Sequence, residues 1–220
     1  MGVDDEPGVD DERGRVRAVA LFDLDGTLID TERRNRVIWQ MLLDNHQLDH
    51  DVAIFMGRRG RDVLPEIFPD HDVEQLIAEV FSYDDHPGLP DVAPVPGAAE
   101  LVRKVAAYGS RIGLVTSARR EWAETRLDQV GVRSLFEVLV TAEDVEIGKP
   151  DPAGFLLAAA RLGVDPDDCV VFEDSVAGIS AAKAAGMKCV AVATTHAGED
   201  LADADLVVAD LTAVGWPPFS

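Results

Sequence analysis

The sequence predicts an α/β protein in which a parallel sheet is interrupted by an inserted helical segment. From residue 93 onward, short apolar runs typical of buried strands alternate with stretches of helical periodicity. One further apolar run, 17–22, precedes this alternation, and only helical patterns occupy the segment 31–92 in between. Strands that alternate with helices form parallel sheets through right-handed crossovers. We therefore expect one sheet built from both flanking regions.

The first half of the chain predicts a tail, one strand and three helices. Residues 1–14 hold six acids and no periodic apolar pattern, so we expect a disordered acidic tail. Residues 17–22 form a continuous apolar run, which is the pattern of a strand buried on both faces. Helical spacing of apolar residues follows over 31–47, 61–68 and 73–81.

The second half begins after a linker. Residues 87–96 contain four prolines and one glycine, a composition that marks a connection rather than a helix or strand. The expected strands beyond it are 111–116, 138–141, 169–172, 188–193 and 205–209. The expected helices are 98–107, 119–130, 152–162 and 175–185.

Composition excludes several function classes. The 220 residues include 41 acidic and 20 basic ones, so the net charge is −21. Such a polyanion repels nucleic acid and anionic membranes, and we expect neither as a partner. No apolar stretch reaches the roughly 18 residues that span a bilayer, and acids stand where a signal peptide needs a basic region. Cys169 and Cys189 lie in apolar runs and are expected to be buried and reduced. These features predict a cytoplasmic protein.

Polar side chains that can do chemistry directly follow several of the expected strands, and Lys149 leads into the helix expected over 152–162. In an open parallel sheet, ligands bind beyond the carboxyl ends of the strands, so these positions converge on one edge. The residues at this edge are Asp23, Asp25, Thr116, Ser117, Lys149, Glu173 and Asp174.

This set of residues suits a metal ion and a phosphate group. Asp23 and Asp174 supply the hard oxygen ligands that Mg²⁺ prefers. Crowded carboxylates resist ionisation, and a divalent cation removes that penalty while creating an anion site. Lys149 and the polar groups of Thr116 and Ser117 would then hold the oxygens of a phosphate.

Two carboxylates allow covalent phosphoryl transfer. A carboxylate such as Asp23 can attack phosphorus and form an aspartyl-phosphate. Asp25 lies two residues further on, past the end of the strand. From there it can protonate the leaving oxygen and later deprotonate the attacking water.

Four segments together resemble the motifs of the haloacid dehalogenase superfamily, in order and on the expected elements. They are FDLDGTLID (22–30), VTS (115–117), GKPDP (148–152) and VVFEDSVAGISAAKAAG (170–186). The helical segment is similar to the cap of the subgroup that holds beta-phosphoglucomutase and the sugar-phosphate phosphatases. The resemblance implies a Rossmann-like parallel sheet core, 15–30 and 93–220, with an inserted all-helical cap domain, 31–92.

The resemblance also implies roles for individual residues. Asp23 is implied as the nucleophile and a metal ligand, and Asp25 as the general acid/base and a metal ligand through its backbone carbonyl. Lys149 is implied to neutralise charge between the nucleophile and the phosphate. The transferring phosphoryl group is implied to be held by Thr116 and Ser117. The remaining metal ligands are implied to be Glu173 and Asp174.

The function implied is a Mg²⁺-dependent phosphatase acting on a small phosphorylated metabolite, a sugar or polyol phosphate, as a monomer. Two alternatives stay open. A phosphomutase of the beta-phosphoglucomutase type would isomerise a sugar phosphate without releasing phosphate. A receiver-like phosphoacceptor switch also places Asp, Thr/Ser and Lys at strand ends, but it would turn over at most one equivalent. A dehalogenase is disfavoured because its second Asp is usually replaced, and Asp25 is present.

The helical segment contains candidates for substrate specificity. Arg58 and Arg59 lie in a basic patch where the family's cap presents its specificity loop. Arginine binds phosphate or sugar hydroxyls with its planar fork, so we expect both to contact substrate, with a solvated helix face as the alternative. Trp39 is expected in the core of the cap. Asn35 stands where beta-phosphoglucomutase has a histidine, which disfavours the mutase alternative.

Overall fold

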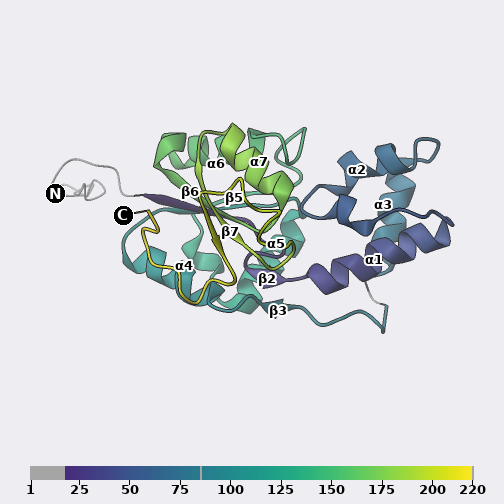
Figure 1. Cartoon of the computed structure of the whole chain (residues 1–220), viewed down its shortest axis with the longest axis horizontal. Coiled ribbons are helices and arrows are strands. Elements are labelled where there is room, and N and C mark those ends of the chain that lie inside the picture. The colour runs from purple at the N-terminus through teal and green to yellow at the C-terminus, as the bar shows by residue number, and fades with distance from the viewer. Residues whose placement is uncertain (1–17, 85, 220) are drawn as a thin grey trace, which may run out of the picture.

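A six-stranded parallel sheet forms the centre of the larger part of the molecule (Figure 1). The computed structural model describes residues 18–84 and 86–219, so the tail expected over 1–14 lies outside the described residues. The strand order is β5-β4-β1-β6-β7-β8, with every neighbouring pair parallel. The strands are β1 Val19–Phe22, β4 Ile112–Val115, β5 Val138–Val140, β6 Cys169–Glu173, β7 Lys188–Val192 and β8 Leu206–Val208.

Helices cover both faces of this sheet, which explains the continuous apolar run in β1. Ala20 and Phe22 belong to the hydrophobic cluster on one face, and Val19 and Leu21 belong to the cluster on the other. Phe22 stacks on Phe172 of the neighbouring strand, with ring centroids 4.7 Å apart. The first face is covered by α4 (Ala98–Ala107) and α5 (Arg120–Val130), and the second by α6 (Ala153–Leu162) and α7 (Val176–Ala184) (Figure 1). The predicted α/β class is confirmed.

A small second sheet lies where the chain leaves and re-enters the sheet region. Strand β2 (Ile29–Asp30) pairs antiparallel with β3 (Ala93–Pro94). The amide of Val95 also donates to the carbonyl of Leu28 at 3.0 Å. Periodicity could not predict this pair, because each strand has only two residues and β3 lies in the proline-rich linker.

The inserted segment, residues 31–92, is called the cap below. It contains α1 (Glu32–Asn45), the 3₁₀ turn η1 (Val52–Phe55), α2 (Gly60–Ile67) and α3 (Val73–Ser82). These elements share a hydrophobic cluster of their own, which includes Leu42, Leu43, Val63, Leu64 and Phe68. Figure 1 shows its three helices beside the carboxyl end of the sheet. The domain boundaries expected from the sequence stay a prediction.

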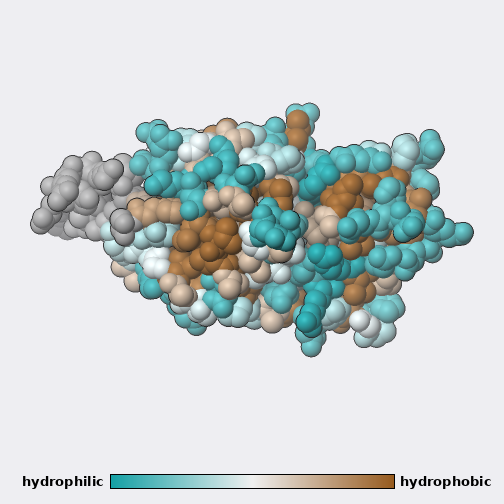
Figure 2. All heavy atoms as spheres, in the orientation of Figure 1, coloured by the Kyte–Doolittle hydropathy of each residue, from teal (hydrophilic) through white to brown (hydrophobic). Residues whose placement is uncertain are grey.

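The surface and the two cysteines agree with the composition. Figure 2 shows that hydrophilic residues cover most of one face of the molecule, around a hydrophobic area over the sheet. Cys169 and Cys189 are buried and unpaired, as predicted. Within the described residues, no helix combines the length and apolar character needed to cross a membrane.

Candidate active site

The side chains at the carboxyl edge of the sheet meet around Lys149. Asp23 continues β1, since its amide donates to the carbonyl of Phe172 at 2.9 Å. The Lys149 ammonium contacts the carboxylates of both Asp23 and Glu173, and all three side chains are at most 7% exposed. Asp174 follows at the end of β6 and is 2% exposed. The structure thus brings together four of the residues predicted from strand ends.

Negative charge exceeds positive charge in this cluster. Asp23, Glu173 and Asp174 each offer an oxygen within 4.8 Å of the others. Burial raises the pKa of Asp23 and Asp174, and the neighbouring carboxylates raise both further, while Lys149 opposes the shift. Burial alone would lower the pKa of Lys149, but Asp23 and Glu173 outweigh it and raise that pKa. With all three carboxyls ionised, the cluster would carry two excess negative charges against one lysine, which a divalent cation with oxygen ligands would balance. The donor set therefore fits Mg²⁺.

Glu173 also shapes the loop that carries Asp174. Its Oε2 atom accepts hydrogen bonds from the amides of Asp174 and Ser175, both at 2.8 Å, and from the Ser175 hydroxyl at 2.9 Å. Ser175 in turn caps α7 by accepting from the Gly178 amide at 3.0 Å. Glu173 therefore links the lysine to the loop as well as adding charge.

Two threonines orient the Asp174 carboxylate. Thr27 donates to Oδ1 at 3.1 Å, and the Thr195 hydroxyl contacts Oδ2. Thr195 was missed by sequence reasoning. It lies just beyond β7, so the same rule that pointed to the other strand ends could have found it.

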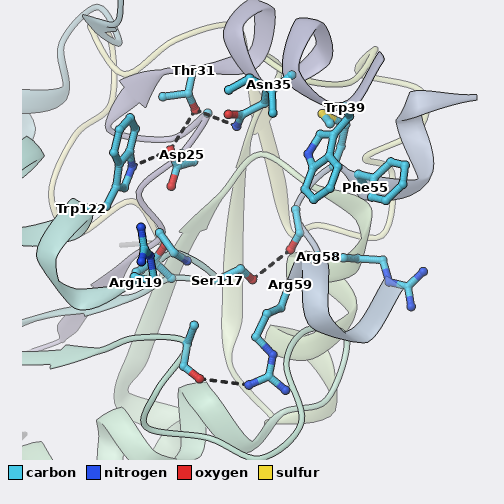
Figure 3. A pocket seen from close by; sticks show the side chains of 18 of the residues that line it. Asp25, Thr31, Asn35, Trp39, Phe55, Arg58, Arg59, Ser117, Arg119 and Trp122 are labelled. Atoms are coloured by element: carbon cyan, nitrogen blue, oxygen red, sulfur yellow. Dashed lines mark hydrogen bonds between the residues drawn. The ribbon is translucent and has the colours of Figure 1, made fainter. Parts of the chain in front are cut away.

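Asp25 is not part of that three-carboxylate cluster and is held by two hydrogen bonds (Figure 3). Its Oδ1 atom accepts from the Thr31 hydroxyl at 3.0 Å and from the Trp122 indole Nε1 at 3.2 Å. Burial raises the pKa of Asp25, and these two donors partly oppose the shift. A carboxyl that keeps its proton at higher pH than usual is suited to act as a general acid. Trp122 and Thr31 were not predicted.

Thr116 and Ser117 lie at the end of β4, as predicted. The Thr116 hydroxyl accepts from the Ala118 amide at 3.0 Å, which turns the chain beside the cavity described next. The Ser117 hydroxyl donates to the carbonyl of Gly57 at 3.3 Å. Gly57 belongs to the cap, so Ser117 joins the two parts of the molecule at the site.

A cavity of about 460 Å³ lies between the sheet edge and the cap. Asp23, Asp25 and Asp174 line it from the sheet side, and Trp39 and Phe55 line it from the cap. The rings of Trp39 and Phe55 stack with centroids 4.2 Å apart and planes 6° apart. Trp39 therefore packs in the cap, as expected, and also lines the cavity (Figure 3). The volume is in the usual range for a small-molecule site.

Arg58 and Arg59 line the cavity, but their guanidinium groups bind protein partners. Arg58 forms hydrogen bonds to Glu66 at 2.6 Å and 3.2 Å and points away from Asp25 (Figure 3). Arg59 donates to Asp62 and to backbone carbonyls near Lys149. Their predicted role in substrate binding has no support in this geometry.

Comparison with known proteins agrees with this geometry. A family model described as haloacid dehalogenase-like hydrolase matches residues 20–192. The chain is 44% identical over 205 residues to the validoxylamine A 7'-phosphate phosphatase of Streptomyces hygroscopicus subsp. limoneus, with 90% of this chain and 96% of the relative covered. It is 35% identical over 177 residues to the fructose-1-phosphate phosphatase of Escherichia coli, with 78% of this chain and 94% of the relative covered. The beta-phosphoglucomutase structure from Clostridium difficile superposes with a TM-score of 0.78 over 92% of this chain and 95% of that one. Its 24% identity shows a shared fold alone.

Proposed function

Because this chain belongs to the haloacid dehalogenase-like hydrolase family and is a phosphoric monoester hydrolase, we propose that it hydrolyses a sugar or polyol phosphate with Mg²⁺ through an aspartyl-phosphate. The observation that carries this proposal is the division of the carboxylates into two groups. Asp23 lies against Lys149 in a buried cluster, whereas Asp25 is held separately by neutral donors. One carboxylate is thereby suited to attack and the other to transfer protons.

Asp23 acts first, as the nucleophile. Its carboxylate oxygen attacks the phosphorus of the bound monoester, and the bond between phosphorus and the leaving oxygen breaks. Lys149 favours the ionised form of Asp23, since its ammonium contacts that carboxylate. Asp25 donates its proton to the departing alcohol, so the products of this step are the free alcohol and phosphorylated Asp23.

Asp25 acts again in the second step, as a base. A water molecule attacks the phosphorus of the aspartyl-phosphate, and Asp25 takes its proton back. The bond between phosphorus and Asp23 breaks, which releases phosphate and restores both carboxyl groups. Thr116 and Ser117 line the cavity beside Asp23, where their polar groups would hold the oxygens of the transferring group.

We propose Asp23, Asp174 and the backbone carbonyl of Asp25 as ligands of Mg²⁺, with Glu173 directly or through water. The ion would neutralise charge on the phosphate oxygens when bound. The excess of two negative charges in the buried cluster supports a divalent ion at this position. Thr27 and Thr195 would keep the Asp174 carboxylate in the orientation that such a ligand needs.

The substrate class rests on the relatives and on the cavity. One phosphatase relative is named for validoxylamine A 7'-phosphate, and the other is named for the sugar phosphate fructose 1-phosphate. The stacked pair Trp39 and Phe55 gives the cavity an apolar wall, against which the C–H face of a sugar or cyclitol ring can pack. A cavity of about 460 Å³ accommodates such a ring together with its phosphate.

A hydrolysis screen tests this function. The protein would be incubated with Mg²⁺ and a panel of phosphorylated sugars, polyols, glycolate and nucleotides, and both free phosphate and the organic product would be measured. We expect repeated turnover with release of phosphate, greatest for sugar or polyol phosphates. An isomerised sugar phosphate without free phosphate would establish the mutase, and at most one equivalent of phosphate would establish the receiver-like switch.

A further inference from the structure

Every N–H group of Arg59 has a protein partner. A guanidinium carries five donors. Nε donates to Asp62 Oδ2 at 3.0 Å and Nη2 to Asp62 Oδ1 at 2.7 Å. Nη1 donates to the carbonyls of Ala142 at 3.0 Å and Val145 at 2.9 Å, and Nη2 contacts the carbonyl of Glu146. Since Arg59 is only 8% exposed, a substrate could bind it only by displacing these partners.

Asp62 extends this contact to the residue before Lys149. Its Oδ2 atom accepts a hydrogen bond from the Gly148 amide at 3.0 Å. A Cβ atom at Gly148 would lie 2.7 Å from Asp62 Oδ2 and 3.2 Å from the Cβ of Arg59. A Cβ atom here would force the Asp62 carboxylate to shift, which gives Gly148 of the GKP motif a reason in the packing of the cap.

The segment 142–148 that Arg59 and Asp62 hold is fixed to the sheet region from its other side. The Asp144 carboxylate accepts from the Thr141 amide at 2.9 Å, from Arg120 at 2.7 Å and from Arg161 at 2.9 Å. The segment therefore lies between the core and the cap, with bonds to both. It leads directly into Lys149, whose ammonium contacts Asp23 and Glu173.

We propose that Arg59 and Asp62 are positioning residues, through which the cap holds the segment 142–148 and thereby sets the place of Lys149 beside Asp23. Arg59 then acts as a structural clamp, which holds the segment that leads into Lys149, and it is not a ligand of the substrate. The inference rests on the proposed function, because it assigns Lys149 a role in phosphoryl transfer. A fixed fork with five donors suits this task, since it can satisfy a carboxylate and three carbonyls at once.

The kinetic test compares Arg59→Ala with Arg111→Ala. Arg111 also binds a carboxylate and a backbone carbonyl, those of Glu137 and Leu162, but it precedes β4 at the opposite edge of the sheet. Each variant would be assayed with acetyl phosphate, which carries no sugar or polyol group, and with the best sugar or polyol phosphate.

We expect Arg59→Ala to lower kcat by at least about tenfold on both substrates, because a misplaced lysine impairs every phosphoryl transfer. KM should change less than kcat, and Arg59→Lys should not restore the rate, since an ammonium has three donors. Arg111→Ala should stay within about twofold of the wild type. An increase in KM for the sugar phosphate alone, with acetyl phosphate unaffected, would overturn the proposal and make Arg59 a substrate ligand.

Hydrogen exchange gives a readout that does not depend on activity. In Arg59→Ala and in the milder Asp62→Asn, the amides of 142–148, and that of Gly148 above all, should exchange faster, while those of β1 keep wild-type rates. Wild-type exchange at Gly148 in both variants would refute the clamp even if no substrate were found. Absence of phosphatase activity in the wild-type protein, with faster exchange in the variants, would instead refute the proposed function alone.

Discussion

Asp23 and Asp25 are two residues apart, and their surroundings give them different chemistry. Burial raises the pKa of Asp23, and the contact with the Lys149 ammonium opposes this rise. Asp25 receives only neutral hydrogen bonds, from a hydroxyl and an indole, and burial raises its pKa. A nucleophile has to be ionised and a general acid has to be protonated at the same pH. Lys149, and a divalent cation when bound, would favour the ionised form of Asp23, whereas the neutral donors leave Asp25 with the raised pKa that suits a general acid.

Trp122→Phe tests the contact to Asp25. Loss of the indole donor removes a hydrogen bond that favours the ionised carboxylate, so the pKa of Asp25 should rise further. The first step needs protonated Asp25, and kcat/KM falls as pH rises through this pKa. We therefore expect the alkaline limb of the kcat/KM profile to move to higher pH, and kcat to fall by about three- to tenfold because the carboxyl is less well oriented.

Trp216→Phe is the matched control for this substitution. The Trp216 indole also donates one hydrogen bond, to the Ser110 hydroxyl at 2.9 Å. Ser110 precedes β4 and therefore lies at the edge of the sheet opposite the catalytic one. Trp216→Phe should leave the position of the alkaline limb unchanged. An identical profile for Trp122→Phe and the wild type would show that the indole contact does not influence Asp25.

At the scale of the elements, α7 contains a residue of low helix propensity, Gly178, where the helix packs against the Glu173 carboxylate. Gly178 lies inside this helix, where alanine is normally more stable than glycine by about 1 kcal/mol. A Cβ atom at Gly178 would overlap the Glu173 carboxylate. Glycine at this position therefore allows the helix to begin directly beside the buried acid.

Gly178→Ala should reverse the usual sign of a glycine to alanine change. We expect the free energy of unfolding to fall by about 1–3 kcal/mol, as for other overpacked sites. The same change in an exposed helix would instead raise the free energy of unfolding. Denaturant unfolding measures the difference. Ser180→Ala, at a half-buried position of the same helix, should be neutral or slightly stabilising. A stabilised Gly178→Ala protein would mean that Glu173 is not packed against α7 as described.

Most elements and most site residues could be predicted because their signals are local. Apolar runs and helical spacing indicated the strands of the main sheet and their helices, and position after a strand indicated Asp23 and Asp174. The same rule applied to β7 would have added Thr195. Trp122 carries no such signal, because α5 brings it to Asp25 from 97 residues away along the chain.

The role of the basic patch could not be predicted because it depends on contacts across the molecule. The local sequence around an arginine beside a cavity does not show whether its side chain binds a ligand or another part of the protein. Arg59 meets carbonyls 83 to 87 residues further along the chain, and these exist as a binding surface only in the folded molecule. Residue type and spacing therefore located the patch but not its protein partners, and the role of Arg58 and Arg59 in substrate binding stays a prediction.

At the scale of the whole molecule, a net charge of −21 makes a phosphate ester an unfavourable ligand. The buried cluster of Asp23, Glu173 and Asp174 adds to this field at the point where the phosphate would bind. Lys149 alone does not offset it. Folding stability and substrate binding should therefore both depend on a divalent cation.

Mg²⁺ should raise the melting temperature in the absence of substrate. An ion at about 100 times its Kd stabilises the native state by about 2.7 kcal/mol, which corresponds to a rise of about 5–10 °C for a chain of this size. Differential scanning calorimetry with Mg²⁺ and with EDTA measures the shift. Asp174→Asn should lose most of it, whereas Asp205→Asn, which breaks an exposed pair with Lys183, should retain it. An equal shift in both variants would place the ion elsewhere.

The most direct measurement is to stop the reaction with acid and locate the phosphoryl group by mass spectrometry. Asp25→Ala would be mixed with Mg²⁺ and acetyl phosphate, because the departing acetate needs no proton from Asp25, whereas loss of the base should let the intermediate accumulate. We predict one phosphoryl group on the peptide that contains Asp23, and neither this adduct nor turnover in Asp23→Asn, although that variant folds. A phosphoryl group on another residue, or Mg²⁺-dependent turnover that survives in Asp23→Asn, would contradict the assignment of Asp23 as the nucleophile.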